Sequence, residues 1–169
     1  MDLFELHHKM TAHLFPAFSC HDERFLALAL YGEAGKLANM IKKCWRDNVD
    51  LGEDIKNEIT DIRIYLELMA KCFNIEGAKL DDLISKIFVV ETHDDDERFI
   101  ALALCNRVGR LGSIIETRWI SNETNGLMHG AAQTEILYIR IYLEMMAKLF
   151  DIDGVKLNHR VEQKLAKMI

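Results

Sequence analysis

Three carboxylate residues occupy positions in two helical segments where the surrounding pattern is apolar. Glu33 interrupts a stripe of apolar residues at helical spacing, and Glu58 and Asp61 lie at the acidic end of a stripe that turns apolar further along. A carboxylate in apolar surroundings must be paired, protonated or bound to a metal ion to be tolerated. Because clustered carboxylate oxygens suit Mg²⁺ or Mn²⁺, we predict a metal site formed by Glu33, Glu58 and Asp61. Asp54, one turn before Glu58, is a candidate for a further oxygen ligand.

A structural interpretation of the acidic pair stays open at this point. Carboxylates at positions i and i+3 near the start of a helix are common, because the helix dipole favours negative charge there. Glu58 and Asp61 would then need no metal ion, and it is Glu33, on the other segment, that argues for a shared site.

Long helices must position these residues. A single proline in 169 residues leaves long segments without a helix breaker, and no segment alternates polar and apolar residues with the period of a strand. We therefore predict an all-α fold. The expected helices cover residues 22–45, 52–73, 77–88, 96–119, 131–150 and 154–168, with an additional amphipathic helix at 2–14.

The chain contains an internal repeat. Residues 22–30 return at 96–104, and residues 58–80 return at 135–157 with 16 of 23 positions identical. The change in offset from 74 to 77 indicates three extra residues in a polar loop near 121–130. Two copies are too few for a solenoid, so they favour an intramolecular pseudo-dimer with a core like that of a four-helix bundle. The predicted organisation is an N-terminal helix at 1–21, a first repeat at 22–90 and a second repeat at 91–169.

Charge and composition narrow the classes of partner. The net charge is −6, whereas a nucleic-acid binder is normally basic because phosphate contacts dominate its affinity. The longest apolar stretch has eight residues, which is too short to span a bilayer. The four cysteines are widely spaced, and acidic residues stand where a signal peptide would be positively charged. We expect a cytoplasmic protein with no nucleic-acid partner and no membrane partner.

The segment Tyr31-Gly32-Glu33-Ala34-Gly35-Lys36-Leu37, followed by Glu58-Ile59-Thr60-Asp61-Ile62, resembles the signature of a known family. The likeness is to the all-α nucleoside triphosphate pyrophosphohydrolases, which include the MazG-like proteins and the dimeric dUTPases. Their pattern is Gly-Glu-x-x-Glu on one helix and Glu-x-x-Asp on the next. The resemblance covers residues 22–87 and, more weakly, 96–168.

The resemblance implies an activity and a set of roles. It implies Mg²⁺-dependent (or Mn²⁺-dependent) hydrolysis of a nucleoside triphosphate, an NTP or dNTP, to a monophosphate and pyrophosphate, as in house-cleaning enzymes. Glu33, Glu58 and Asp61 would be the catalytic residues, because they would hold the metal ions that bridge the phosphates. The family commonly assembles through its helix faces, so the resemblance also allows a homodimer.

This sequence departs from the family pattern at the first acidic pair. Lys36 replaces the second glutamate of the first copy, and the second copy has Arg107 and Arg110 in place of both. At the positions of the Glu-x-x-Asp pair, the second copy has Glu135 and Tyr138. A cationic side chain does not ligate a metal ion, so the second copy is predicted to be inactive.

The three cations are candidate substrate-binding residues, because arginine and lysine suit phosphate groups. Three alternatives remain open for Arg107. It could fill the vacated metal site as an ion pair, contact a bound phosphate or lie on the surface.

Two rival functions follow from these departures. A catalytically degenerate MazG-like protein would bind a nucleotide or a protein partner without hydrolysis, and Lys36 favours it. The joint presence of Glu33, Glu58 and Asp61 in one copy favours the enzyme. A third hypothesis, a helical structural module, predicts no metal binding.

Overall fold

The computed structural model describes residues 22–75, 82, 84, 96–121, 126–152 and 154–167, and this part of the chain is helical with no strand. The predicted all-α class is therefore confirmed. The helices are α2 (Glu23–Asp47), α3 (Gly52–Cys72), α5 (Glu97–Ser121), α6 (Gly126–Leu149) and α7 (Gly154–Ala166). None of these helices is both long and apolar enough to cross a membrane. The helices expected at 2–14 and, apart from residues 82 and 84, at 77–88 lie outside the described residues.

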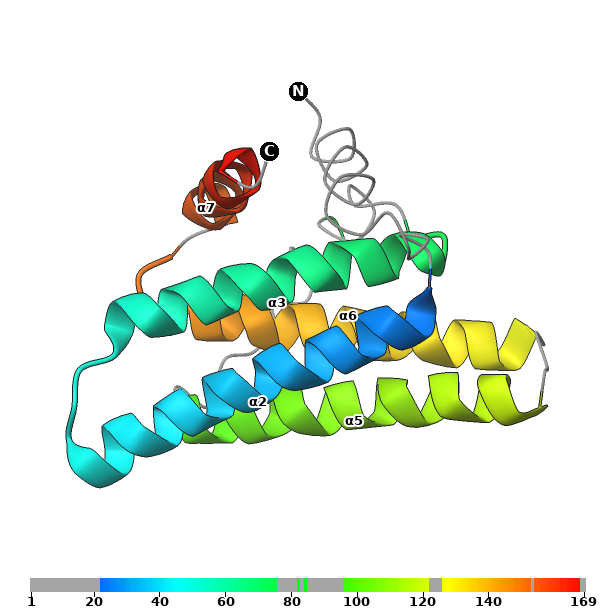
Figure 1. Cartoon of the computed structure of the whole chain (residues 1–169), viewed down its shortest axis with the longest axis horizontal. Helices are drawn as coiled ribbons and strands as arrows, with labels where there is room; N and C mark the ends of the chain where they lie inside the picture. The colour runs from blue at the N-terminus through cyan, green and yellow to red at the C-terminus, as the bar shows by residue number, and fades with distance from the viewer. Residues whose placement is uncertain are drawn as a thin grey trace.

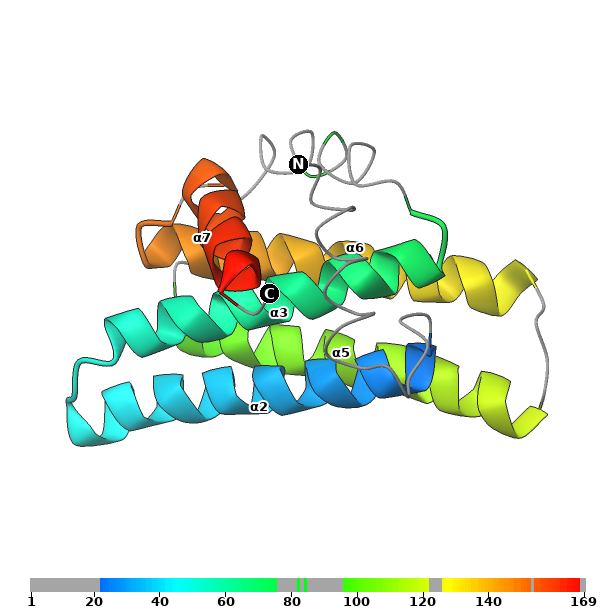
Figure 2. The same ribbon diagram turned by 45° about the horizontal axis from the view of Figure 1, so that its top comes forward.

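Four of the helices pack as a bundle. Helix α2 packs against α3 and α5, and α6 packs against the same two helices from the other side (Figure 1). Each helix runs antiparallel to both of its neighbours in the bundle. Helix α7 lies outside the bundle, across α3 and α6 (Figure 2). The middle of α2 is thereby set against the middle of α3, where the predicted acidic residues lie.

The core follows the helical periodicity of the sequence. The apolar stripe of α3 is completely buried, and so are the core residues of α2 that face it. Full burial of a leucine or isoleucine side chain stabilises the fold by about 1.5–3 kcal/mol. The buried stripes of these two helices consist of Leu26, Leu30, Leu37, Ile41, Ile55, Ile59, Ile62, Leu66 and Met69.

Equivalent residues of the repeat begin and end the helices. The carboxylate of Asp22 accepts a hydrogen bond from the backbone N–H of residue 24 at 2.9 Å, and Asp96 does the same for residue 98 at 2.8 Å. The side chain of Arg24 lowers the pKa of the Asp22 carboxyl to about 2, and that of Arg98 does the same for Asp96. After α3 and α6 the backbone turns at Asn74 and Asp151, with φ of 54° and 56°. Asp22 and Asp96 thus cap the first turns of α2 and α5.

The start of α6 differs from the prediction. The helix begins at Gly126, five residues before the expected start at 131. Glycine lowers helix propensity by about 1 kcal/mol but does not forbid a helix. Gly126 and Gly130 both lie in open space within the first turns, so no packing constraint opposes the helical backbone there.

Two pairs of contacts join positions that are equivalent in the repeat. The guanidinium of Arg24 lies 5.0 Å from the ring of Trp119, and that of Arg98 lies 5.1 Å from the ring of Trp45. Each contact joins the start of one of the two helices, α2 or α5, to the end of the other.

The second pair of contacts connects α3 with α6 and is buried. Arg63 donates to Glu144 at 2.7 Å, and Arg140 donates to Glu67 across the same interface. Each arginine also pairs with the glutamate four residues along its own helix. Because both arginine side chains are only 5% exposed, the paired carboxylates compensate charge that would otherwise be costly to bury.

Candidate metal centre

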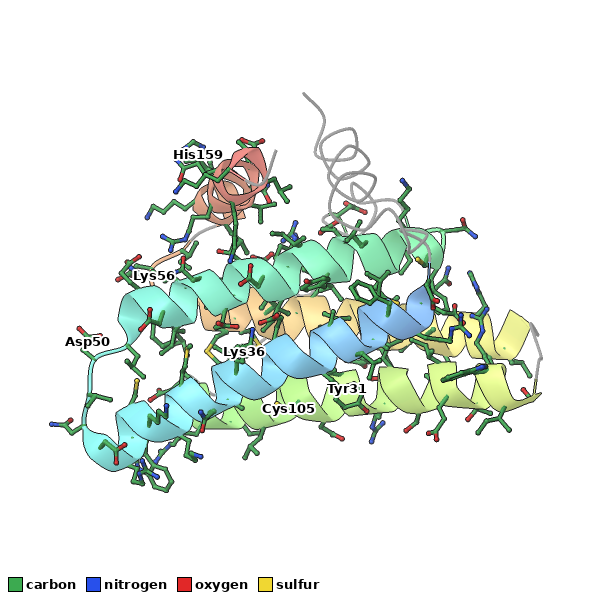
Figure 3. The ribbon with its side chains drawn as sticks, viewed as in Figure 1. Tyr31, Lys36, Asp50, Lys56, Cys105 and His159 are labelled. Carbon is green, nitrogen blue, oxygen red and sulfur yellow. The ribbon has the colours of Figure 1, made fainter. Side chains whose placement is uncertain are left out.

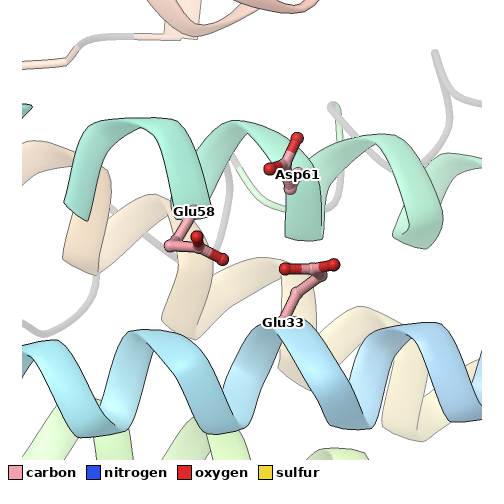
Figure 4. Close-up of side chains that lie close together, drawn as sticks. All are labelled: Glu33, Glu58 and Asp61. Atoms are coloured by element: carbon pink, nitrogen blue, oxygen red, sulfur yellow. The ribbon is translucent and has the colours of Figure 1, made fainter. Parts of the chain in front are cut away.

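The three predicted acidic residues meet between α2 and α3. Glu33 extends from the middle of α2 toward Glu58 and Asp61, which project from one face of α3 (Figure 4). One carboxylate oxygen from each residue lies within 4.8 Å of the others. The convergence expected from the sequence is therefore present in the structure.

Fully buried core residues hold the three carboxylates in place. Leu30 and Leu37 flank Glu33 along α2, while Ile59 and Ile62 lie beside Glu58 and Asp61 on α3. The acidic side chains stand at the edge of this apolar contact and are themselves partly buried. The packing that joins the two helices therefore also sets the spacing of the acidic groups.

The local environment opposes ionisation of Glu58. Burial, followed by the adjacent Glu33 carboxylate, raises the pKa of Glu58 to about 7. Its Oε2 atom is buried and receives no hydrogen bond from any described residue. Burial also raises the pKa of Asp61, although Lys164 acts in the opposite direction. The site thus holds negative charge that the surrounding protein compensates only in part.

Two lysines supply positive charge that partly compensates the three carboxylates. Lys36, an exposed residue of α2 (Figure 3), donates a hydrogen bond from Nζ to Glu33 Oε2 at 2.7 Å. The Nζ atom of Lys164, on α7, forms an ion pair with Asp61. The predicted phosphate ligand Lys36 is therefore engaged with an acidic residue of the site.

Sequence reasoning missed the contribution of α7. Arg160, Lys164 and Lys167 are spaced by four and three residues, which places them on one face of the helix. That spacing was a readable signal of a basic face. What the sequence did not show is that this face lies against the acidic end of α3.

A cleft of about 500 Å³ opens beside the acidic residues, between α3 and α7. The predicted helper Asp54 lies on its wall but outside the group of three converging carboxylates. Most of the lining is polar, so the cleft suits a charged ligand rather than an apolar one. The lining residues are Met40, Asp54, Asn57, Glu58, Thr60, Asp61, Arg160, Gln163, Lys164 and Lys167.

The equivalent positions of the second repeat hold a different arrangement. Arg107 donates to Glu135 Oε2 at 3.3 Å, and its guanidinium lies 3.9 Å from the ring centre of Tyr138. Of the three alternatives for Arg107, the structure shows the ion pair within its own repeat. Arg110 lines a separate pocket with Glu135, and neither arginine lines the cleft beside the acidic triad.

The residues of the first repeat fit a divalent cation. Three hard oxygen donors converge, and the buried Glu58 oxygen lacks a donor among the described residues. Mg²⁺ characteristically binds through a few carboxylates and keeps waters beside a phosphate group. Glu33, Glu58 and Asp61 would hold such an ion.

Comparisons of the chain with known protein families, with curated proteins and with solved structures find no match. The likeness to the MazG-like pyrophosphohydrolases therefore stays a prediction from the sequence. The acidic site and the cleft beside it are the features of the structure that bear on function.

Proposed function

We propose that the protein is a Mg²⁺-dependent nucleotide pyrophosphohydrolase of the MazG-like kind, also able to use Mn²⁺. It would cleave an NTP or dNTP to a monophosphate and pyrophosphate. The observation that supports this proposal most directly is the convergence of Glu33, Glu58 and Asp61 within 4.8 Å beside a polar cleft. Such a cleft can receive a phosphate chain next to the acidic residues.

The proposal includes an architecture in which the two repeats pack as an intramolecular pseudo-dimer. Reciprocal contacts at equivalent positions support it, because Arg24 meets Trp119 as Arg98 meets Trp45. The buried ion pairs between α3 and α6 are reciprocal in the same way, because Arg63 pairs with Glu144 as Arg140 pairs with Glu67. In this arrangement the first repeat supplies the active site, and the second supplies an equivalent scaffold without one.

Each side chain of the site has a role in the proposed reaction. A bound divalent cation would supply positive charge for the phosphate oxygens and would acidify a water molecule. Without the cation, burial and the neighbouring Glu33 raise the pKa of Glu58 to about 7, so binding of the cation would release a proton from this carboxyl near neutral pH. Glu33 and Asp61 each bring a carboxylate oxygen to the group, and Lys36 and Lys164 pair their ammonium groups with these two residues.

A second candidate function has its own supporting observation. Lys36 and Lys164 pair with two of the three carboxylates, so the protein itself neutralises part of the site. That arrangement fits a catalytically degenerate MazG-like protein which binds a nucleotide or a protein partner without hydrolysis. We place it second because the Glu58 oxygen still lacks a donor within the described part of the chain.

The test is pyrophosphate release from a panel of standard and modified nucleoside triphosphates with Mg²⁺ or Mn²⁺. Glu58→Gln removes one proposed ligand, and Glu135→Gln makes the same change at the equivalent position of the second repeat. We expect metal-dependent release that falls by about 100-fold or more in Glu58→Gln and persists in Glu135→Gln. The panel would also name the substrate.

A folded wild-type protein that releases no pyrophosphate from any nucleotide would contradict the enzymatic proposal. Titration with Mg²⁺ and with a nucleotide would then separate the two remaining functions. Binding would support the degenerate relative, and the absence of binding would leave a structural module.

A further inference from the structure

Helix α7 brings a basic face to the acidic site. Arg160, Lys164 and Lys167 line the cleft opposite the acidic residues of α3. Among the described residues, Lys164 is the α7 side chain that forms an ion pair with a member of the triad. Arg160 lies further along and donates to Glu53 at 3.3 Å and to Asn57 at 3.1 Å. Of the three basic residues, Lys164 therefore pairs with the triad, while Arg160 and Lys167 line the cleft next to it.

The position of α7 does not depend on the Lys164 ion pair. Leu157, Val161 and Leu165 are completely buried on a face of the helix adjacent to the basic one, and the last two pack against Ile64. These contacts hold α7 through apolar burial, while the four-carbon stem of a lysine allows its ammonium group to move. Lys164 can therefore change partner without moving its helix.

The charges of the site make such a change favourable when a cation arrives. With all groups ionised, three carboxylates and two ammonium groups give the site a net charge of −1. A divalent cation reverses that sign. It also competes with the ammonium group of Lys164 for Asp61, because the two cations repel each other at short distance.

We propose that Lys164 is the internal counter-ion of the acidic site, that a divalent cation bound by the triad displaces it from Asp61, and that the released ammonium group then joins Arg160 and Lys167 in binding a phosphate-bearing ligand in the cleft. The inference rests on the metal site proposed above. It adds a coupling between the two ligands, since metal binding creates part of the anion site. By linkage, the anion must strengthen metal binding to the same degree.

The first experiment measures Mg²⁺ and Mn²⁺ affinity by calorimetry with no nucleotide present. Lys164→Met keeps the apolar stem and removes the competing cation. We expect it to bind the metal about 5-fold more tightly than the wild type, the size of effect that a partly exposed ion pair supports. Lys167→Met, on the same face but without contact to the triad, controls for the general loss of positive charge and should change the affinity by less than 2-fold, roughly.

The second experiment measures binding of inorganic phosphate by phosphorus NMR, with and without saturating Mg²⁺. In the wild type, we expect Mg²⁺ to tighten phosphate binding, and Lys164→Met to lose most of that gain. Lys156→Met, also on α7 but outside the cleft lining, is the matched control and should keep the gain. Thermal unfolding of each variant checks that α7 remains packed.

The outcomes separate this inference from the proposed function. Wild-type protein that binds metal, together with Lys164→Met that binds it equally or more weakly, overturns the counter-ion role and leaves the metal site standing. Equal phosphate binding with and without Mg²⁺ overturns the coupling. Failure of the wild type and of Lys164→Met to bind either metal overturns both proposals, whereas binding by the variant alone supports the counter-ion role.

Discussion

Arg107 on α5 and Glu135 on α6 form an ion pair at 3.3 Å, at the positions that Glu33 and Glu58 occupy in the first repeat. In the second repeat a cation therefore replaces one of the carboxylates and satisfies another. In the first repeat both carboxylates are retained, and the cations approach from outside. The two repeats thus carry opposite charge arrangements at equivalent positions, and the first keeps three converging carboxylates that could hold a cation.

The raised pKa of Glu58 predicts how stability depends on pH. Its pKa is about 7 in the folded protein against 4.5 for the free side chain. Between these values the folded protein holds a proton that the unfolded chain has released. The free energy of unfolding should therefore fall as pH rises through this window, by about 1–2 kcal/mol once solvent screening is included. Chemical denaturation at about pH 5 and about pH 8, without metal, measures the change.

The glutamine variants provide the control for this pH effect. Glu58→Gln should flatten most of the decrease, whereas Glu135→Gln should leave it in place. Added Mg²⁺ should restore stability at about pH 8, because an ion that binds only the folded state adds to its stability by mass action. An unchanged slope in Glu58→Gln would assign the pH dependence to another group.

Lys36 offers a direct test of the departure from the family pattern. Lys36→Glu removes an ammonium group from Glu33 and adds a carboxylate one turn away on the same face of α2. We expect Mg²⁺ affinity to rise by about 10-fold, and the metal-free protein to lose about 1 kcal/mol of stability through like-charge repulsion. Calorimetric titration and denaturation measure the two effects.

Lys36→Met separates the loss of a cation from the gain of a ligand. It should raise the metal affinity less than Lys36→Glu does, because it adds no oxygen donor. Equal affinities for the two variants would place residue 36 outside the coordination shell.

The fold was predictable to the extent that it depends on local pattern. Apolar spacing of three and four residues gave α2, α3 and α5, and it also placed Glu33 on the face of α2 that meets α3. The convergence of the triad followed, because antiparallel packing of two helices sets their middle turns against each other. The predicted start of α6 was wrong because the polar stretch near 121–130 was assigned to a loop, although the helix begins at Gly126 and continues through Gly130.

The missing half of the site depends on tertiary contacts that no local pattern contains. The basic face of α7 is visible in the spacing of Arg160, Lys164 and Lys167, but the partner of that face is not. Helix α7 docks by burying Val161 and Leu165 against Ile64, and Ile64 is about a hundred residues away from them in the sequence. Sequence reasoning could therefore name the acidic residues without naming the lysine on Asp61.

The ion pair of the second repeat should be structural and should not affect the metal site. Arg107→Met leaves the Glu135 carboxylate, which is 9% exposed, without its charged partner. We expect a loss of about 1–3 kcal/mol in the free energy of unfolding, partly recovered when Glu135→Gln is added. Denaturation of the single and double variants gives the coupling energy. Mg²⁺ affinity should stay within a factor of about 2, and a larger change would mean that the two sites are linked.

Close packing of α2 on α5 gives a matched pair of glycine substitutions. A Cβ atom at Gly112 would lie 2.4 Å from the ring of Tyr31, whereas one at Gly109 would lie 3.7 Å from the hydroxyl of the same side chain. Alanine favours a helix by about 1 kcal/mol over glycine, so Gly109→Ala should stabilise the protein by about that amount. In Gly112→Ala the ring must turn away and lose its hydrogen bond to the Gly109 carbonyl, which it now donates at 3.1 Å.

The hydrogen bond and the displaced ring contacts should offset the gain in helix propensity. We expect Gly112→Ala to be less stable than Gly109→Ala by about 1–2 kcal/mol, measured as a difference in denaturation midpoint at constant slope. Tyr31→Phe provides the test of cause, because it removes the hydrogen bond but keeps the ring. If the two alanine variants were equally stable, the ring of Tyr31 would be free to leave α5 without cost, and its contact would add nothing to the packing of the two helices.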